Sequence, residues 1–569
     1  MKRCPQCGRE YDTSMKFCLD DGVELLYGPA STDGPPTEVF YVTEPPSEAP
    51  TKLQSHTTDR PSELSSSIAN SFGTRSFNKR LLAAPLLVAV IVFGGYFGYR
   101  YFASASTKQI NSIAVLPFQN RSGDADTDYL SDGIAESLIY RLSQLNDLKV
   151  SPVSSVIRYK GKEADVTQIA RELGVAAVMS GRMTQRGDNL NISVELIDAV
   201  NNKILWGEQF DRKMSELLAT QREIAATITE KLQLKLSGEE KGLTKKYTNN
   251  SEAYQLFLNG RYHFARRERE DMFKSIELYE QAVKLDPTFA LAYVGIAESY
   301  ATIPSYPYAS PEECVPKAKA AVARALELDP ELAEAHTVAG MIAASYDWDY
   351  AEAERRFKRA LELGPDLAVT HFRYGWTFLS PLGRHDEAVA EMKRAMEIEP
   401  LSIQQGANFA AVLIYAGRFD EALAQARKTY DLDPNHIGAQ NWLCHALNAK
   451  GLSEDAIKIG LDAEAKQLTT VNSFNACLGL AYARTGQREK SLEIVSKLKE
   501  AEKRRYVMSY WTGVHYLALG DKQSAIAELE KGFKNHDWFM QRLKTDPFIE
   551  PLRGDPRYQE MLKRLNLPN

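Results

Sequence analysis

Three cysteines and an aspartate lie close together at the start of this chain, in a spacing that suits a metal ion. Cys4 and Cys7 are separated by two residues, and Cys18 follows after a spacer of ten residues. Two thiolates with this separation can bind one tetrahedral zinc ion, and a carboxylate oxygen can complete the set of ligands. We therefore expect Cys4, Cys7, Cys18 and Asp21 to bind one structural zinc ion, less tightly than four thiolates would.

The same segment resembles a short zinc ribbon. Gly8 follows the first cysteine pair, and Gly22 follows the second half of the motif, where Asp21 replaces the second cysteine. The resemblance implies a ribbon over residues 1–26, with Asp20 as an alternative fourth ligand. A ribbon without its metal and a cluster of reactive thiols are the other interpretations. Four Lys or Arg residues against five Asp or Glu in this segment give little support to nucleic-acid binding.

Known catalytic motifs do not accompany these residues. The sequence has no glycine-rich phosphate loop with its lysine, no HExxH motif and no GxSxG motif. An acidic stretch between residues 123 and 132 could bind a metal, but turn and helix N-cap chemistry explains it better. We therefore expect no enzyme activity. The residues of the acidic stretch are Gly123, Asp124, Asp126, Asp128 and Asp132.

Length and composition indicate several domains. A chain of 569 residues exceeds the size of a single hydrophobic core. Its formal net charge of −6 gives no basic footprint for nucleic acid. Six scattered cysteines are too few for a disulfide framework.

A tether and a membrane span are expected after the ribbon. Residues 27–78 contain seven prolines and no sustained apolar period, which is typical of a disordered linker rich in Pro, Ser and Thr. Residues 81–103 carry no charge before Arg100. A helix of that length reaches about 35 Å, which covers a bilayer core of about 30 Å. We expect this segment to be a transmembrane helix.

Basic residues predict the orientation of the span. Three Lys or Arg residues lie just before it, and one lies at a similar distance after it. This imbalance places the amino terminus in the cytoplasm and the carboxy-terminal domains outside. Gly94 and Gly98 form a GxxxG pair through which two spans could pack as a homodimer. The basic residues are Arg75, Lys79 and Arg80 before the span and Lys108 after it.

Strand and helix signals alternate over residues 109–236. Leu190, Ile192, Val194 and Leu196 alternate with polar residues, which predicts a strand with one buried face. Turn residues on both sides of this strand indicate a three-stranded meander. The expected strands include 112–118, 148–156, 190–196 and 203–210, and the expected helices are 129–145, 166–173 and 214–234.

Three stretches of this region carry a family resemblance. They are SIAVLPFQNRSGDADTDYLSDGIAESLIYRLSQL, VSSVIRYKGKEADVTQIARELGVAAVMSGRM and LNISVELIDAVNNKILWGEQFDR. In this order they resemble the TolB amino-terminal-like domain, which is related to the CsgG and FlgO group of bacterial envelope proteins. The resemblance implies a mixed α/β fold, an envelope or signalling setting, and an extracytoplasmic or membrane-proximal module joined to tetratricopeptide repeats. It does not imply catalysis. With the expected span, we place the protein in the bacterial inner membrane.

Regularly spaced prolines divide the carboxy-terminal half of the chain. Pro330, Pro365, Pro400 and Pro434 are 35, 35 and 34 residues apart. Proline cannot continue a helix, and small residues let two helices approach, so this period predicts stacked helix pairs. The small and aromatic residues expected at the helix crossings are Gly340, Ala353, Phe357 and Ala360 in one unit and Gly375, Phe378, Ala388 and Ala395 in the next.

The pattern is similar to tetratricopeptide repeats. We count about eight units over residues 252–535, within a domain of residues 250–569 that ends in a capping helix near 546–566. His371, His445 and His515 lie within repeat helices, where packing explains them.

The second unit carries an insertion. Pro287 and Pro330 are 43 residues apart because of an extra loop from Ala301 to Glu313. Tyr306 and Tyr308 in this loop either contact a partner or belong to a surface loop without a role.

The sequence therefore predicts a multidomain protein with a small zinc ribbon, one transmembrane helix, a mixed α/β domain and an all-α tetratricopeptide superhelix. We expect a membrane-anchored adaptor or sensor whose repeats bind a protein or peptide on a preformed concave face. One alternative is an envelope assembly factor that oligomerises through its CsgG-like domain. Another is a transcriptional regulator that acts through the ribbon.

Overall fold

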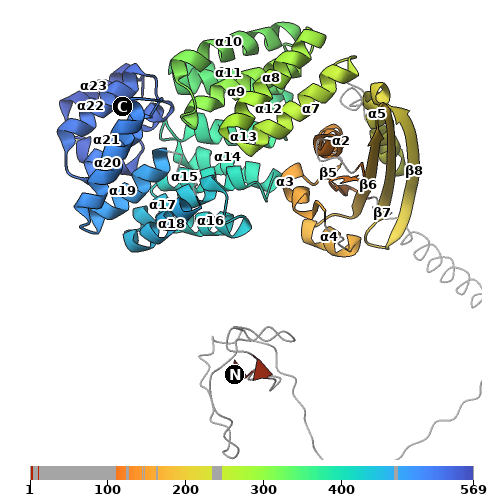
Figure 1. The fold of residues 1–569 in the computed structure, drawn as a ribbon, viewed down its shortest axis with the longest axis horizontal. Helices are drawn as coiled ribbons and strands as arrows, with labels where there is room; N and C mark the ends of the chain where they lie inside the picture. The colour runs from red at the N-terminus through yellow and green to blue at the C-terminus, as the bar shows by residue number, and fades with distance from the viewer. Residues whose placement is uncertain are drawn as a thin grey trace, which may run out of the picture. The chain divides into compact units, whose positions relative to one another are not determined.

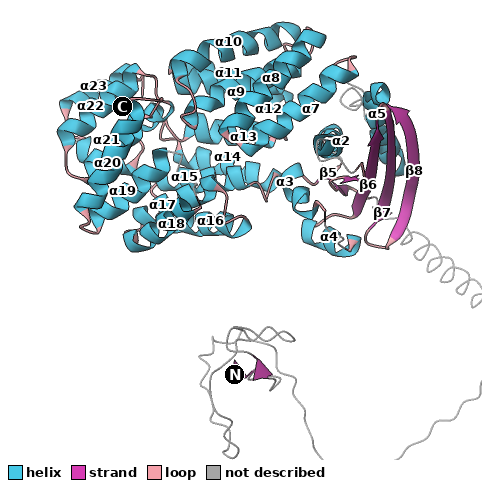
Figure 2. Cartoon of the chain, in the orientation of Figure 1, coloured by secondary structure: helices cyan, strands magenta, loops and turns pink. Residues whose placement is uncertain are grey.

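The structure is a computed structural model that divides the chain into two compact units, Met1–Tyr101 and Phe102–Asn569. In the first unit, β1 (Lys2–Arg3) pairs antiparallel with β2 (Glu10–Tyr11). The second unit contains a sheet domain followed by helical repeats (Figure 2). The described residues are 2–3, 10–11, 110–122, 127–143, 145, 148–161, 165–232, 247–466 and 472–567.

The sheet of the second unit is mixed. Its strands run in the order β5-β3-β6-β7-β8, and β4 pairs with β6 beyond the end of β3. β3 is parallel to both of its neighbours, whereas β6, β7 and β8 form an antiparallel meander. The strands are β3 (Ser112–Val115), β4 (Gln119–Asn120), β5 (Lys149–Val150), β6 (Ala177–Arg186), β7 (Asn189–Asp198) and β8 (Lys203–Lys213).

Two long helices share a hydrophobic core with this sheet. Leu138 on α2 and Ile228 on α5 are fully buried, as is Ile192 on β7. On β7 the apolar residues at 190, 192, 194 and 196 are buried while their polar neighbours are not, as the alternation predicts. The helices are α2 (Asp128–Leu142), α3 (Val153–Val156), α4 (Val166–Leu173) and α5 (Leu217–Lys231), with short 3-10 turns η2 (Ile157–Tyr159) and η3 (Met214–Glu216).

One expected strand is wrong over most of its length. The segment 148–156 forms only the short strand β5 and then turns into α3. Pro152 explains the change, because it has no N–H for a strand ladder and its fixed φ suits the residue that precedes a first helical turn. It is the N-cap residue of α3, with φ −70° and ψ 161°.

The repeats consist of eight consecutive helix pairs within the described residues (Figure 1). The helices that open the third and fourth pairs continue into π-helical segments, η5 (Ala343–Asp347) and η6 (Tyr374–Leu379). The pairs are α7 (Ser251–Arg266) with α8 (Arg269–Leu285), α9 (Ala290–Thr302) with α10 (Pro311–Leu328), α11 (Ala333–Ile342) with α12 (Tyr350–Leu363), α13 (Ala368–Arg373) with α14 (His385–Ile398), α15 (Ile403–Tyr415) with α16 (Phe419–Leu432), α17 (Ile437–Ala449) with α18 (Ser453–Ala465), α19 (Asn472–Arg484) with α20 (Arg488–Glu502), and α21 (Ser509–Ala518) with α22 (Lys522–Lys534).

The small residues at the helix crossings confirm the tetratricopeptide-like architecture. A Cβ atom on Gly340 would lie 3.1 Å from the ring of Phe357, and one on Gly375 would lie 3.0 Å from the carbonyl oxygen of Ala388. Phe357 and Ala388 are fully buried. The helix axes can therefore approach only because these positions lack bulk.

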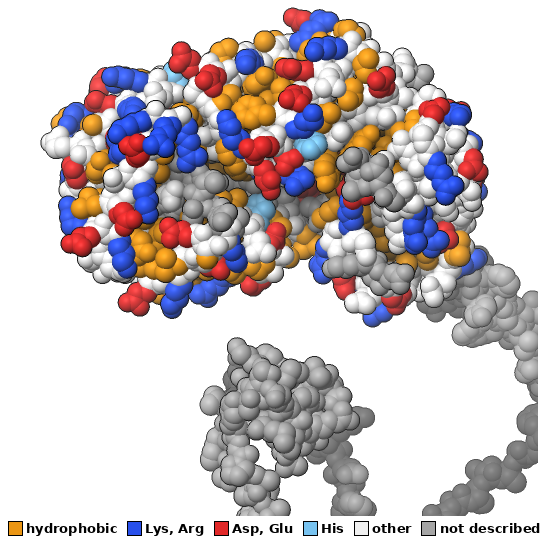
Figure 3. Space-filling model, viewed as in Figure 1, with side chains coloured by type: hydrophobic (Ala, Val, Ile, Leu, Met, Phe, Trp, Pro, Cys, Tyr) orange, Lys and Arg blue, Asp and Glu red, His pale blue; other side chains and the backbone are white. Residues whose placement is uncertain are grey.

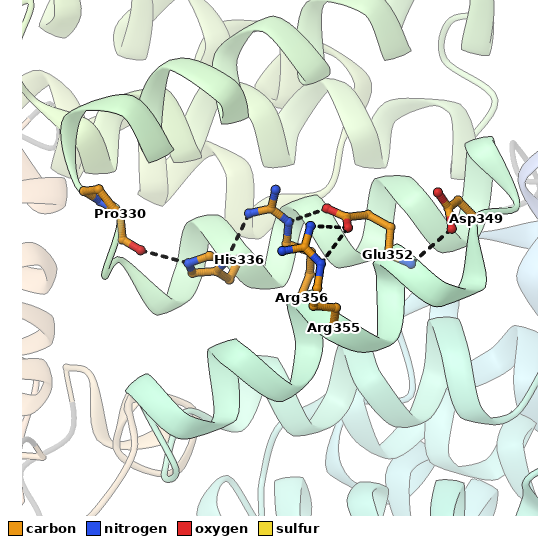
Figure 4. A network of polar contacts seen from close by, with 6 residues as sticks. All are labelled: Pro330, His336, Asp349, Glu352, Arg355 and Arg356. Carbon is orange, nitrogen blue, oxygen red and sulfur yellow. Dashed lines mark hydrogen bonds and ion pairs between the residues drawn. The ribbon is translucent and has the colours of Figure 1, made fainter.

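The proline that ends a unit is also tied to the next helix by a polar contact, which Figure 4 shows for the third unit. His336 Nε2 lies 2.9 Å from the carbonyl oxygen of Pro330, and Arg356 Nη1 lies 3.3 Å from His336 Nδ1. Burial and the nearby arginine charges lower the pKa of His336, so the ring is neutral, donates from Nε2 and accepts at Nδ1. Equivalent contacts join His371 to Pro365 at 2.8 Å and Gln440 to Pro434 at 2.6 Å.

The carboxy-terminal segment folds back into the repeats instead of only capping the last one. Arg542 is fully buried and donates to Ser380 Oγ at 3.2 Å and to the carbonyl oxygen of Trp376. His536 Nδ1 lies 3.0 Å from the carbonyl oxygen of Tyr346. This segment packs against residues of the third to sixth pairs. It comprises the 3-10 segments η7 (Trp538–Arg542) and η8 (Pro547–Leu552) and the helix α23 (Pro556–Arg564).

Candidate binding pocket between the sheet domain and the repeats

The residues that the sequence singled out for metal binding lie outside the described residues. These are Cys4, Cys7, Cys18 and Asp21. In the part of the chain that the structure describes, no group of three or more His, Cys, Asp or Glu residues could hold a metal ion. The zinc site therefore stays a prediction.

The expected tether at 27–78, the expected span at 81–103 and the pair Gly94 and Gly98 also lie outside the described residues. Among the helices that are described, none combines the length and the apolar character needed to cross a bilayer. The membrane span and the homodimer through its glycines stay predictions as well.

The sheet domain packs directly on the first repeat. Figure 1 shows α2 between the sheet and the first repeat helices. Gly133 on α2 makes the close approach possible, because a Cβ atom there would lie 2.7 Å from Leu258 Cδ1 on α7. Gly133 directly follows the acidic stretch that we assigned to turn and cap chemistry, and the neighbouring Asp132 forms an ion pair with Lys160 at 2.7 Å.

Buried polar contacts fix this packing. Tyr254 on α7 donates to Ser137 Oγ at 2.8 Å, and Ser137 donates to Gln221 Oε1 on α5 at 2.9 Å. Tyr140 on α2 donates to Glu334 Oε1 on α11 at 2.7 Å. Because each buried polar group here is costly to leave unpaired, this network specifies one arrangement of the sheet domain on the repeats.

A cavity of about 1000 Å³ lies between α2 and the inner helices of the first five repeats. We call it the inner pocket. Its apolar lining includes Phe257, Val338 and Phe372, which are at least nine-tenths buried. A concave pocket of about this volume is typical of a binding site.

Charge in the inner pocket is balanced. Six arginines and six Asp or Glu residues line it among the described residues, and Figure 3 shows both signs mixed over the visible face of the molecule. Arg261 forms an ion pair with Glu136, and Arg373 forms one with Glu298 at 3.1 Å. Burial raises the pKa of Glu399 to about 7, which leaves that carboxyl partly protonated near neutral pH.

Arg267 is the exception to this pairing. Its Nη1 atom is buried and has no hydrogen-bond partner, and no ion pair involves it among the described residues. The guanidinium lies over the ring of Phe264, 3.7 Å from the ring centre. Burial lowers its pKa, although arginine remains charged. The position also has φ 58°, a left-handed conformation that costs a non-glycine residue about 1–2 kcal/mol.

The insertion in the second repeat supports this strained position. Tyr308 donates to the carbonyl oxygen of Arg267 at 3.1 Å, and Tyr306 donates to Gln404 Oε1 on α15 at 3.3 Å. Both rings are partly buried and stack on each other with centres 5.8 Å apart. The insertion is therefore not a free surface loop, because it links the second repeat to the fifth across the inner side of the array.

Two further features escaped the sequence analysis. Cys444 and Cys477 form a disulfide with Cα atoms 6.2 Å apart, joining α17 to α19. The available signal was their separation of 33 residues, which matches the repeat period and places them at equivalent positions. Arg267 gave no signal, because the lack of a partner for its Nη1 atom is visible only once distant segments are placed around it.

The expected roles of the repeat histidines hold. His371 Nδ1 lies 2.6 Å from Glu391 Oε2, and His515 Nε2 lies 2.8 Å from Ser491 Oγ. His445 is fully buried among Trp442, Trp511 and Phe548. Packing and local hydrogen bonds account for all three.

Sequence comparison finds similarity over parts of the chain. A family model described as HilA/YgeH-like transcriptional regulator, second domain, matches residues 108–227. A curated protein named "Putative adenylate cyclase 3", from Rhizobium meliloti (strain 1021), is 33% identical over 187 residues, which is 33% of this chain and 32% of that protein. The chain thus spans about a third of the length of the curated relative that it matches.

Solved structures show only a distant likeness. TTC0263, a thermophilic TPR protein from Thermus thermophilus, is 21% identical with a TM-score of 0.30, over 34% of this chain and 98% of that chain. PilW, described as a widely conserved type IV pilus biogenesis factor, is 19% identical with a TM-score of 0.32, over 38% of this chain and 94% of that chain. At these TM-scores the repeat architecture rests on the helix pairs and crossings of this chain alone.

Proposed function

We propose that this protein is a membrane-anchored adaptor or sensor that binds a protein or peptide partner in the inner pocket. The observation that carries the proposal is the pocket itself, which keeps about 1000 Å³ open in the first five repeats. The chain's own carboxy-terminal segment packs against other parts of the third to sixth repeats. The proposed partner-binding face is the inner pocket, with α2 of the sheet domain as one wall.

The remaining parts of the proposal come from the sequence. The zinc ribbon at 1–26 would be cytoplasmic, the span at 81–103 would cross a bacterial inner membrane, and residues after 103 would be extracytoplasmic. The disulfide between Cys444 and Cys477 supports that location for the repeats, because disulfides persist outside the reducing cytoplasm. The sheet domain would be a TolB amino-terminal-like module, and the protein would have no catalytic activity.

A second candidate is a transcriptional regulator that acts through the ribbon. The match of residues 108–227 to the second domain of a transcriptional regulator favours it. The acidic balance of the ribbon, with five Asp or Glu against four Lys or Arg over residues 1–26, disfavours direct binding of nucleic acid. Failure of the full chain to bind DNA or RNA at low salt would remove this candidate.

Site-specific photocrosslinking in cells tests the adaptor proposal. A photoreactive phenylalanine analogue replaces Val369, which is half-buried and lines the inner pocket, or Leu461, which is exposed on α18 away from it. We expect discrete protein adducts from position 369 and none of the same adducts from position 461. Position 369 without adducts, or identical adducts from both positions, would contradict the inner pocket as the binding face.

A further inference from the structure

The corner of the inner pocket around Arg267 is rich in hydrogen-bond donors. Arg267 brings a guanidinium whose Nη1 has no partner. His436 Nδ1 accepts the N–H of Ala439 at 3.3 Å, so the proton of the neutral ring is on Nε2. Gln404 accepts the Tyr306 hydroxyl through Oε1, which leaves its amide N–H groups free to donate.

Two of the carboxylates that line the inner pocket, Glu298 and Glu399, already have partners. Glu298 is paired with Arg373 at 3.1 Å, and Glu399 accepts from Gln405 Nε2 at 2.6 Å. Burial lowers the pKa of His436; the negative charge of Asp433 opposes this shift, and the positive charge of Arg267 adds to it. Arg267 is half-buried, and its Nη1 atom is buried without a hydrogen-bond acceptor. Leaving such a donor unpaired is unfavourable, and a ligand that supplies an acceptor would remove that penalty.

We propose that Arg267, with His436 and Gln404, binds a single carboxylate of the partner peptide, either an Asp or Glu side chain or a free carboxy terminus. This inference rests on the proposed function of the inner pocket. Carboxylate geometry suits a guanidinium fork, and the neighbouring ring of Phe264 favours an apolar residue beside the acidic one.

A polyanion does not fit the same site. Six acidic residues line the inner pocket among the described residues, and one unpaired arginine can neutralise only one added charge. A phosphate group or a nucleic-acid backbone would place further negative charge beside Glu298 and Glu399, and like charges repel one another at that distance.

The test uses the purified full chain in detergent with two displayed libraries of random dodecapeptides, one with free carboxy termini and one with blocked termini. We expect enriched peptides to carry a carboxylate beside an apolar residue. Amidation of that carboxylate should weaken binding about 10- to 100-fold, the range for one charge-assisted hydrogen-bonded contact. In Arg267→Gln the acidic and amidated peptides should bind within about twofold of each other.

Arg269→Gln is the matched control. Arg269 is exposed two residues away, lies over Phe273 at 5.2 Å and does not line the inner pocket, so this variant should behave as the unsubstituted chain. Comparison of terminal amidation with Asp→Asn or Glu→Gln in the peptide identifies which carboxylate is bound. Discrimination that persists in Arg267→Gln, or enriched peptides without any carboxylate, would overturn the proposal.

A second probe separates this inference from the proposed function. If neither library is enriched, peptide binding itself fails, and the carboxylate site is tested with N-acetylphenylalaninate against N-acetylphenylalaninamide. A rise in the melting temperature with the carboxylate alone, lost in Arg267→Gln, would support the anion site. No rise would refute it, and a larger rise with inorganic phosphate through Arg267 would show that the ligand class is wrong.

Discussion

Replacing Arg542 by alanine tests whether the carboxy-terminal segment is part of the core of the repeats. The guanidinium is fully buried, lies 3.5 Å from the centre of the Trp376 ring and 4.6 Å from that of Tyr415, and donates hydrogen bonds to Trp376 and Ser380. Two hydrogen bonds from a charged donor contribute about 1.5–3 kcal/mol each, and a desolvated cation–π contact about 2 kcal/mol. The cost of burying the charged guanidinium offsets part of this stabilisation, and the same burial lowers the pKa of Arg542 to about 10. We expect a net loss of about 3–5 kcal/mol in the free energy of unfolding.

Hydrogen exchange resolved by segment is the assay for this variant. Exchange should rise in η6, in α15 and in the segment from η7 to α23, while the sheet domain keeps its protection. Arg557→Ala is the control, because Arg557 is exposed on α23 and its ion pair with Asp555 is screened by solvent, so the variant should keep nearly all of its stability. A loss under about 1 kcal/mol for Arg542→Ala, or equal loss of protection over the sheet domain, would refute the reasoning.

Three further predictions concern pH, metal and redox state. Burial raises the pKa of Asp537 to about 7, above its unfolded value. Its contribution to the free energy of unfolding is therefore fully present below about pH 4 and is lost as pH rises to 7. In Asp537→Asn the free energy of unfolding should depend less steeply on pH over that range, by up to about 1.4 kcal/mol per pH unit, and an unchanged slope would contradict this. Elemental analysis of the reduced, purified full chain should find about one zinc per molecule, Cys7→Ser should lower this occupancy, and a metal-free unsubstituted chain would exclude the site. Cys444 and Cys477 should resist alkylation when protein taken from cells is unfolded without reductant. Under the same conditions, Cys477→Ser should make Cys444 reactive towards the alkylating reagent. Alkylation of both cysteines in the unsubstituted chain would show that the pair is reduced in the cell.

The repeat architecture could be predicted because its signals are local and periodic. The spacing of Pro330, Pro365 and Pro400 gave the helix pairs, and the glycines and alanines at the crossings are buried as that interpretation requires. The alternation on β7 predicted its buried face in the same way. Where a local signal was ambiguous, as at Pro152, a residue without an N–H determined the outcome.

The inner pocket could not be predicted, because contacts between distant parts of the chain create it. Tyr140 meets Glu334 across 194 positions of sequence, and Tyr306 meets Gln404 across 98. No pattern within one helix predicts which side chain will face another at such a distance. The unpaired state of Arg267 is likewise a property of everything that surrounds it, and the sequence analysis placed the candidate chemistry at the other end of the chain.

The return of the carboxy-terminal segment to the third and fourth repeats has a consequence for synthesis and for evolution. Arg542 and Gln541 bond to residues 162 and 196 positions earlier, so these repeats lack part of their core until almost the whole chain has left the ribosome. A linear repeat array can gain or lose a unit without affecting distant ones. Here an added unit between the fourth repeat and the carboxy terminus would shift η7 away from Ser380 and Ser345. The contacts that η7 makes with the third and fourth repeats therefore fix the number of repeats between them.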